Sequence, residues 1–299
     1  MSEVFVVGAL HLDVVVDAPR LPLLDETLFG KAVAYRFGGK GGNQALAAAR
    51  MGAGVAMAGR VGGDAFGVQV LETLAASGVD HSQVRKAAGA TGMSVAIVED
   101  TGEYGAVVVS GVNQTIDPEE VDAGRARVVL LQNEIPEAVN LAVVRSGRAE
   151  TTIILNAAPA RKVPPDLMAG VDILVVNRVE AAQMTGLDPD RFDAEIAAKE
   201  LALLGPPAVV VTLGADGAVV LENGRLDRVT PPIRANGSAH GAGDAFVGAL
   251  AAEIARGSKL IEAVEFASAS AACFVSLAPD DRPTINREAV LTLRGGRGV

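Results

Sequence analysis

The sequence predicts an α/β fold in which a mostly parallel sheet has helices on both faces and a small second sheet stands outside it. Short runs rich in β-branched residues recur along the 299 residues. Continuous apolar strands of this kind are typical of sheets that are buried on both faces. Segments with the apolar spacing of helices lie between most of the runs, and two stretches without such a segment predict the second sheet.

The strands predicted for the main sheet are short and bounded by turn residues. They are VFVVGAL near the start, followed by GVAMAGRVG, VVLLQ, TIILN, ILVVN and AVVVTLG. Helical spacing follows in the segments Asn43 to Gly52, Phe66 to Gly78 and Phe192 to Gly205. Strands that alternate with helices predict βαβ units and therefore a parallel sheet.

Residues 12–36 and 92–110 break this alternation. Their strands are separated by Pro, Asp-Glu or Thr-Gly turns without a helix between them. We expect them to form a small sheet that acts as a lid. Because no internal repeat or low-complexity linker interrupts the chain, we expect a single domain over residues 1–299 with the two lid segments inserted in it.

Composition and charge narrow the range of partners. The formal net charge is −10 and the 26 Lys and Arg residues are scattered along the chain, at most two in succession, so a nucleic acid is not an expected partner. No apolar run is long enough to cross a membrane, and the N-terminus does not resemble a signal peptide. The single Cys273 is expected in the core and fits a reducing compartment, so we expect a cytoplasmic location.

The turn Gly241-Ala242-Gly243-Asp244 leads directly into an apolar helical pattern. Glycines let backbone N–H groups point outward, and the positive end of a helix dipole lies there, so the turn predicts an anion hole. A carboxylate beside a bound phosphate is unfavourable unless it takes a proton from an attacking hydroxyl. Acidic residues also occur at helix N-termini because the dipole favours them. From the turn alone, both interpretations of Asp244 stay open.

Two further glycine segments suggest ligand contacts. In FGGKGGNQALAAA, residues 37–49, four glycines surround Lys40, and Asn43 opens the expected helix, so both side chains can donate to hydroxyl groups. In VTLGADGAVV, residues 211–220, Thr212 and Gly214 leave a strand in a way that suits a nucleotide, although Gly-Ala-Asp-Gly is also an ordinary hairpin turn. Neither the P-loop motif nor the dinucleotide-binding glycine pattern is present.

The glycine segments, together with the stretches between them, resemble the ribokinase-like (PfkB) sugar kinases, and GGKGGNQ and NAAPAR are closest to the ribokinase members. The similarity runs in order over nearly the whole chain, through GALHLD, GGKGGNQALAAARMGAGVAMAGRVGGDAFG, LLQNE, NAAPAR, NRVEAAQMTG, TLGADG and GAGDAFVGAL. The resemblance implies a Rossmann-like domain with a β-sheet lid. It also implies an ATP-dependent carbohydrate kinase that transfers the γ-phosphoryl of ATP to a sugar hydroxyl with Mg²⁺.

The resemblance assigns roles to individual residues. It makes Asp244 the catalytic base and the N–H groups of Gly241, Ala242 and Gly243 the anion hole. The sugar contacts that it implies are His11, Asp13, Gly39, Lys40, Asn43 and Glu134. On the ATP side it implies Asn177, Thr212 and Gly214, with Glu180 organising Mg²⁺ through water.

The substrate is less narrowly defined than the reaction. Ribokinases have Asn where this chain has His11, which either donates to a sugar hydroxyl or packs at the base of the lid. Ribose or another pentose is the favoured acceptor, and a nucleoside or a ketose is the alternative. A non-catalytic regulator that binds sugar or nucleotide is a remote alternative, because binding alone does not need a base in an anion hole.

Two segments depart from the family pattern. Ser238, Ala239 and His240 stand where these kinases usually have Asp-Thr-x, and LAPDDRPT, residues 277–284, replaces a Gly-Ala loop. Both segments belong to the monovalent-cation site of K⁺-activated members, so we expect weak or absent activation by K⁺. The resemblance also implies a homodimer formed through the lid.

Overall fold

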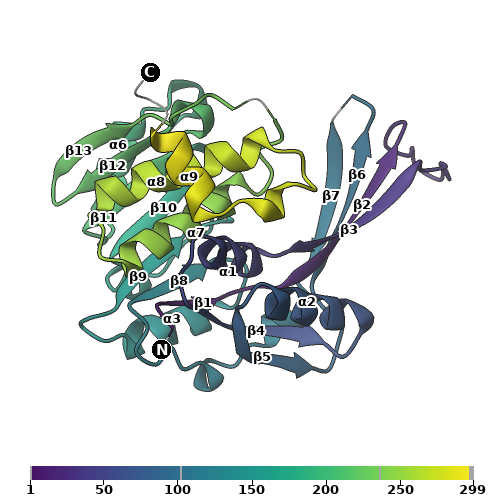
Figure 1. Cartoon of the computed structure of the whole chain (residues 1–299), viewed down its shortest axis with the longest axis horizontal. Helices are drawn as coiled ribbons and strands as arrows, with labels where there is room; N and C mark the ends of the chain where they lie inside the picture. The colour runs from purple at the N-terminus through teal and green to yellow at the C-terminus, as the bar shows by residue number, and fades with distance from the viewer. Residues whose placement is uncertain (1, 102, 236, 296–299) are drawn as a thin grey trace.

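The structure is a computed structural model, and it describes residues 2–101, 103–235 and 237–295. Within them, the main sheet has nine strands in the order β13-β12-β11-β10-β9-β8-β1-β4-β5 (Figure 1). Only the pairs β11–β12 and β12–β13 are antiparallel, so the expected mostly parallel sheet is confirmed. The strands are β1 (Val4–Val7), β4 (Val55–Gly62), β5 (Asp80–Ala87), β8 (Val128–Gln132), β9 (Thr152–Asn156), β10 (Ile173–Asn177), β11 (Ala208–Thr212), β12 (Ala218–Glu222) and β13 (Arg225–Val229).

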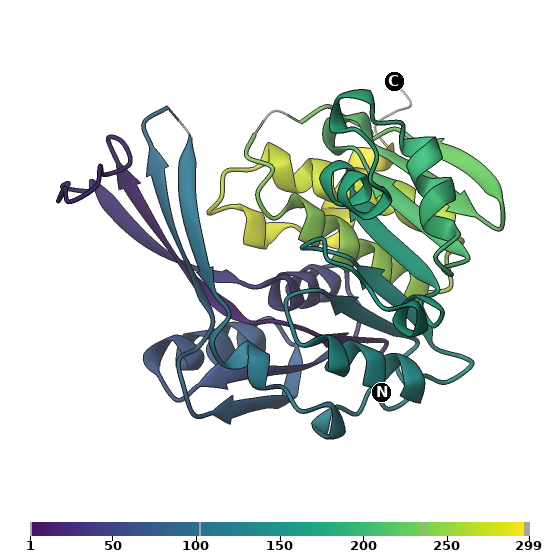
Figure 2. The ribbon, with the colours of Figure 1, turned by 180° about the vertical axis from the view of Figure 1, so that it is seen from behind.

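Helices cover both faces of this sheet. One face carries α1 (Lys40–Arg50), α2 (Ala65–Ala76), α7 (Ala242–Ala255), α8 (Leu260–Ser276) and α9 (Arg287–Gly295). The other face, seen from behind in Figure 2, carries α3 (Glu137–Ser146), α4 (Pro165–Met168), α5 (Arg178–Thr185) and α6 (Ala194–Ala202). Alternate strand residues feed the two cores: Val4 and Val6 pack on the first side, and Phe5 and Val7 on the second.

The second sheet has the strand order β3-β2-β6-β7 and projects from one side of the molecule in Figures 1 and 2. Its strands are β2 (His11–Ala18), β3 (Ala32–Gly38), β6 (Met93–Glu99) and β7 (Tyr104–Val109). The pairs β2–β3 and β6–β7 are antiparallel, whereas β2 and β6 are parallel. The predicted segments 12–36 and 92–110 therefore contain nearly all of this sheet.

Helix α1 begins earlier than the sequence suggested. We expected Asn43 to open it, but it starts at Lys40, with Gly39 as its N-cap at φ 83°. A Cβ on Gly41 would lie 2.6 Å from the backbone of Gly8, so this glycine lets the first turn of the helix pack against the end of β1. The glycines thus serve a close backbone approach within a helix rather than a loop.

Helices α1 and α7 pack closely against each other. A Cβ on Gly248 of α7 would lie 2.5 Å from the carbonyl oxygen of Gln44 in α1. This approach brings the first turns of the two helices together, which places Asp244 beside Asn43 and Gln44. No helix within the described ranges is long and apolar enough to cross a membrane.

Candidate active site

Asp244 lies in the first turn of α7 and is held by two amides from α1. The Nδ2 of Asn43 donates to its Oδ2 at 3.2 Å, and the Nε2 of Gln44 donates to its Oδ1 at 2.9 Å. The carboxyl is buried, and this burial raises its pKa although the charge of Lys40 and the two amide hydrogen bonds act in the opposite direction. Asp244 is therefore an oriented carboxyl group with a stronger affinity for a proton than an exposed aspartate has.

Lys40 interacts electrostatically with three carboxylates of the site. Its backbone N–H donates to the Oε2 of Glu134 at 2.7 Å. Burial alone would lower the pKa of Lys40, but the charges of Asp244, Glu134 and Glu180 outweigh it and raise this pKa. Burial raises the pKa of Glu134 to about 6, against the hydrogen bond and the charge of Lys40. The positive charge of Lys40 therefore lies near Asp244 and favours its ionised form, which is the form that a general base needs.

Three cavities lie around the first turn of α7. The largest, of 610 Å³, lies between the second sheet and the main body, and Asp13, Asn43 and Ser94 contribute to its lining. A cavity of 180 Å³ adjoins it, and Asp244 and Gly241 line both. A third cavity, of 300 Å³, shares Thr212 and Gly243 with the 180 Å³ cavity. Asp244 therefore stands between a roomy cavity under the second sheet and a small polar cavity that continues toward Thr212.

The glycine turn has unpaired backbone donors. Gly241 caps α7 in the left-handed conformation, at φ 82°. The N–H groups of Gly241, Gly243 and Asp244 have no acceptor within the described residues, whereas the N–H of Ala242 donates to the carbonyl oxygen of Ala239 at 3.0 Å. Free N–H groups at the N-terminus of a 14-residue helix form a suitable place for an anion.

Four residues that we expected on the ATP side gather at the neighbouring strand ends. Asn177 ends β10 and pairs in register with Thr212, which ends β11. Asn177 and Glu180 form a reciprocal capping box at the start of α5, with both hydrogen bonds at 2.8 Å. Both side chains line the 180 Å³ cavity together with Lys40, and burial raises the pKa of Glu180. Gly214 begins the hairpin between β11 and β12 at φ 61° and lines the 300 Å³ cavity.

The donor set near Glu180 suits a metal ion that keeps its own water. Among the described residues, no group of three or more His, Cys, Asp or Glu side chains is close enough to hold a metal directly. Glu180 uses Oε2 in the capping box, and its Oε1 accepts no hydrogen bond from the described chain. Mg²⁺ binds through one or two carboxylates, waters and phosphate oxygens, so a single carboxylate with a free oxygen beside a small polar cavity fits it.

The remaining expected sugar contacts lie where β1 and α1 approach the second sheet. Asp13 lines the 610 Å³ cavity and accepts a hydrogen bond at 3.1 Å from the N–H of Ser94, which joins β2 to β6. Gly39 is buried as the N-cap of α1. His11 is only 4% exposed, its Nε2 has no partner within the described residues, and burial lowers its pKa. Neither His11, Gly39 nor Glu134 is among the residues that line the three cavities.

Sequence reasoning missed Gln44 and Asn156. The Nε2 of Gln44 donates both to Asp244 and, at 3.0 Å, to the Oδ1 of Asn156 at the end of β9. Gln44 is fully buried and directly follows Asn43. Its position next to a residue already singled out was the available signal, but periodicity alone reads a buried helix position as packing.

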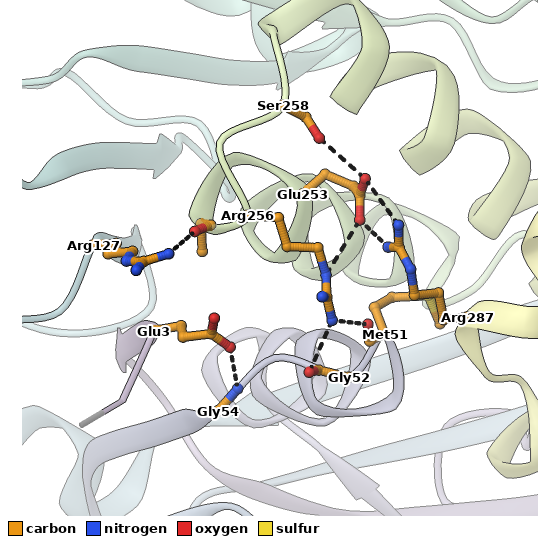
Figure 3. A network of polar contacts seen from close by, with 10 residues as sticks. Glu3, Met51, Gly52, Gly54, Arg127, Glu253, Arg256, Ser258 and Arg287 are labelled. Atoms are coloured by element: carbon orange, nitrogen blue, oxygen red, sulfur yellow. Dashed lines mark hydrogen bonds and ion pairs between the residues drawn. The ribbon is translucent and has the colours of Figure 1, made fainter.

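An ionic network ties together the far ends of α1 and α7 (Figure 3). Buried Glu253 of α7 pairs with Arg287 and lies 3.6 Å from the Nε of Arg256. Arg256 in turn donates to the carbonyl oxygens of Met51 and Gly52, at 3.2 and 2.9 Å, just beyond the end of α1. The two helices are thus joined at both ends.

The comparison with known proteins agrees with this arrangement. The family model described as "pfkB family carbohydrate kinase" matches residues 1–281. The chain belongs to this family. The expectations of the PfkB family, of its fold and of an ATP-dependent carbohydrate kinase are thereby confirmed.

Individual PfkB relatives match over nearly the whole chain. The ribokinase of Schizosaccharomyces pombe is 33% identical over 293 residues, which cover 92% of each chain. The crystal structure of Thermotoga maritima ribokinase superposes with a TM-score of 0.89 at 26% identity and covers 99% of this chain and 100% of that one. Arabidopsis thaliana ribokinase complexed with ribose and ATP superposes with a TM-score of 0.87 at 28% identity and covers 98% of both chains.

Proposed function

We propose that this PfkB protein transfers the γ-phosphoryl of ATP to a hydroxyl of ribose or another pentose. The observation that carries the proposal is the position of Asp244 between the 610 Å³ and 180 Å³ cavities. A base at this boundary can take a proton from an acceptor on one side while a phosphoryl group is held on the other. The ribokinase names of the relatives and the ribose and ATP of the Arabidopsis complex support the choice of substrates.

The proposed mechanism depends on positioning and charge. Asp244, oriented by Asn43 and Gln44, takes the proton of the sugar hydroxyl. The backbone N–H groups of Gly241 and Gly243 stabilise the charge on the transferring phosphoryl. The N–H of Ala242 joins them when its hydrogen bond to Ala239 opens. Lys40 adds positive charge from the side of the 180 Å³ cavity.

ATP is proposed to occupy the 180 and 300 Å³ cavities. Asn177 would contact the phosphates, and Thr212 and Gly214 would line the remainder of the nucleotide. Mg²⁺, when bound with ATP, supplies positive charge to the phosphate oxygens. Glu180 would hold this ion through water with its free carboxylate oxygen.

The sugar is proposed to bind in the 610 Å³ cavity. Asp13 and Asn43 line it and can accept from or donate to hydroxyl groups, and His11, Gly39, Lys40 and Glu134 are the further contacts proposed from the family resemblance. A volume of 610 Å³ falls in the range that holds ligands larger than a pentose. This keeps a nucleoside or a ketose as the second candidate. ADP release measured over a panel of pentoses, ketoses and nucleosides decides between them, and turnover of a nucleoside without turnover of ribose would reverse the order.

The second sheet is proposed as a lid and as the contact in a homodimer. It lines the 610 Å³ cavity through Ser94, Ala96 and Val108, so its movement would close that cavity. Its exposed apolar residues, Val33, Tyr35, Val107 and Val109, form a surface that a second lid would cover. The location is proposed to be the cytoplasm, with which the unbonded Cys273 agrees.

The substitution Asp244→Asn tests the catalytic assignment. It keeps the size and shape of the side chain, but an amide cannot accept the proton of the sugar hydroxyl at neutral pH. We expect kcat for ADP release to fall about 100- to 10,000-fold, which is the usual contribution of a general base. The matched control is Asp166→Asn, at an exposed carboxylate paired with Arg145, which should leave kcat unchanged. If Asp244→Asn keeps the activity of the parent protein, the assignment is wrong.

A further inference from the structure

The turn before Asp244 is bound by a guanidinium from a distant loop. Arg282 lies in the 3-10 turn η5 (Arg282–Thr284), between α8 and α9, and only 9% of its surface is exposed. Its Nη2 donates to the carbonyl oxygen of Ser238 at 2.7 Å, and its Nη1 donates to the carbonyl oxygen of His240 at 3.1 Å. One planar group thus holds two carbonyl oxygens of the segment that leads into α7.

The same guanidinium rests on an aromatic ring that also contacts the turn. The Cζ of Arg282 lies 4.4 Å from the centroid of the Phe274 ring. A Cβ built on Gly241 would lie 3.1 Å from the Cζ of this ring, so the ring and the glycine are nearly in contact. Arg282 and Phe274 therefore contact the turn at three places, at Ser238, His240 and Gly241.

Few other contacts restrain this segment. Ser238, Ala239 and His240 are exposed. Within the described residues, the hydrogen bonds internal to the turn are those from Ala242 to Ala239, at 3.0 Å, and from the N–H of His240 to the Oγ of Ser238, at 3.4 Å. The second of these is long for a hydrogen bond. Hydrogen bonds from a charged donor are roughly twice as strong as neutral ones, so the two bonds from Arg282 dominate.

We propose that Arg282 is a positioning residue that holds the turn from Ser238 to Gly241 and thereby preorganises the donors at the start of α7 and the carboxylate of Asp244. The inference rests on the proposed phosphotransferase function. It adds a structural reason for the expectation of weak K⁺ activation, because the carbonyl oxygens of Ser238 and His240 already have a cationic partner that belongs to the chain.

The preorganisation matters because catalysis is sensitive to small displacements. The donors at Gly241 and Gly243 must lie at hydrogen-bond distance from the phosphoryl oxygens at the moment when charge develops. A turn that samples other conformations places them there for only part of the time. Loss of Arg282 should therefore lower kcat more than it changes the KM for sugar. Arg282 also lines the 610 Å³ cavity, but its guanidinium is engaged by the turn, and Asp13 and Asn43 offer polar groups to the sugar from other elements.

The test compares Arg282→Ala and Arg282→Lys with Arg287→Ala. Arg287 is a matched control, because its guanidinium also lies over a ring, 4.8 Å from the centroid of Phe266, but it pairs with Glu253 far from the turn. For Arg282→Ala we expect kcat to fall about 10- to 100-fold, which corresponds to a misplacement of about 1 Å. Millimolar guanidinium chloride should restore part of this loss. Arg282→Lys, which can keep one of the two bonds, should be intermediate, and Arg287→Ala should keep the parent kcat and show no rescue.

A second measurement does not depend on turnover. Amide hydrogen exchange of the segment from Gly237 to Phe246 should be faster in Arg282→Ala than in the parent protein and unchanged in Arg287→Ala. If the parent protein phosphorylates no sugar, the proposed function fails, while the exchange experiment still tests whether Arg282 holds the turn. A parent-like kcat in folded Arg282→Ala would overturn the inference. So would a lower kcat without faster exchange, or a large rise in sugar KM at unchanged kcat, because either result indicates direct contact with substrate.

Discussion

The close approach of α1 and α7 makes Gly248→Ala a sharp test of how the site is positioned. The added Cβ would lie 2.5 Å from the carbonyl oxygen of Gln44, 2.6 Å from the Cβ of Ala47 and 2.9 Å from the backbone nitrogen of Ala48. Two of these three atoms belong to the backbone of α1, so no side-chain rotation relieves the contact. The helices must separate by about 1 Å to restore ordinary van der Waals distances.

Two terms of opposite sign set the effect of Gly248→Ala on stability. Overpacking of a core costs about 1–3 kcal/mol. Alanine is favoured over glycine in a helix by about 1 kcal/mol, which offsets part of this cost. We expect the free energy of unfolding to fall by up to about 2 kcal/mol.

The effect on catalysis should be larger. Separation of the helices stretches the hydrogen bonds from Asn43 and Gln44 to Asp244, which now measure 3.2 and 2.9 Å. A displacement of about 1 Å near the reacting groups can lower the rate about 100-fold. We therefore expect the activation free energy of the reaction to rise by more than the free energy of unfolding falls.

Urea unfolding and steady-state ADP release measure the two effects. The control is Gly295→Ala at the end of α9, where a Cβ would meet nothing within 4 Å. It should leave kcat unchanged. A Gly248→Ala variant that gains stability and keeps the parent kcat would refute the reasoning, because only the helix-propensity term would then be acting.

Three further substitutions separate stability from activity. Gly243→Ala places a methyl group in open space, so the free energy of unfolding should stay unchanged or rise by up to about 1 kcal/mol. The same methyl group intrudes on the two cavities proposed for ATP, so the KM for ATP should rise. Glu134→Gln removes a carboxyl whose pKa is raised from 4.5 to about 6. The folded protein holds this proton more tightly than the unfolded chain does. The free energy of unfolding of the parent should therefore fall relative to that of the variant, by about 2 kcal/mol, as the pH rises from 4.5 to beyond 6. Urea unfolding at both pH values checks the sign. Glu253→Gln removes the buried negative charge that pairs with Arg287 and Arg256. Because both arginines are partly exposed, the free energy of unfolding should fall by only about 2 kcal/mol. We expect kcat to stay nearly unchanged. A loss of activity larger than the loss of stability in Glu253→Gln would contradict its assignment to the framework.

Most of the architecture could be predicted because it depends on local pattern. The six predicted strands of the main sheet and the helices α2 and α6 follow from runs of apolar residues and from turn residues that lie next to them in the chain. The start of α1 could not be predicted in this way. Whether the glycines of GGKGG form a loop or a helix depends on the backbone of Gly8, against which Gly41 packs.

The site shows the same division. Residues 241–244 predict an anion hole from their own chemistry, whereas the role of Asp244 as a base is implied by the family resemblance. The structure leaves the N–H groups of Gly241 and Gly243 unpaired within the described chain. The N–H of Ala242 instead donates to the carbonyl oxygen of Ala239 within the turn, and no pattern in the sequence indicates this bond. The hairpin interpretation of Gly-Ala-Asp-Gly is confirmed, because the segment joins the antiparallel strands β11 and β12. The nucleotide contact of Gly214, which lines the 300 Å³ cavity, stays a prediction.

The sequence by itself determined the α/β class, the family and the chemical groups of the site, because these depend on residue types and on their order. Only the tertiary structure decided which groups touch: Gln44 reaches Asp244 across 200 residues, and Arg282 reaches Ser238 across 44. Such contacts depend on how helices and loops pack in space, and a buried glutamine or an arginine in a loop has no local signature of its partner. The sequence therefore points directly to the proposed base and anion hole, whereas the amide of Gln44 and the guanidinium of Arg282 beside them become visible only in the fold.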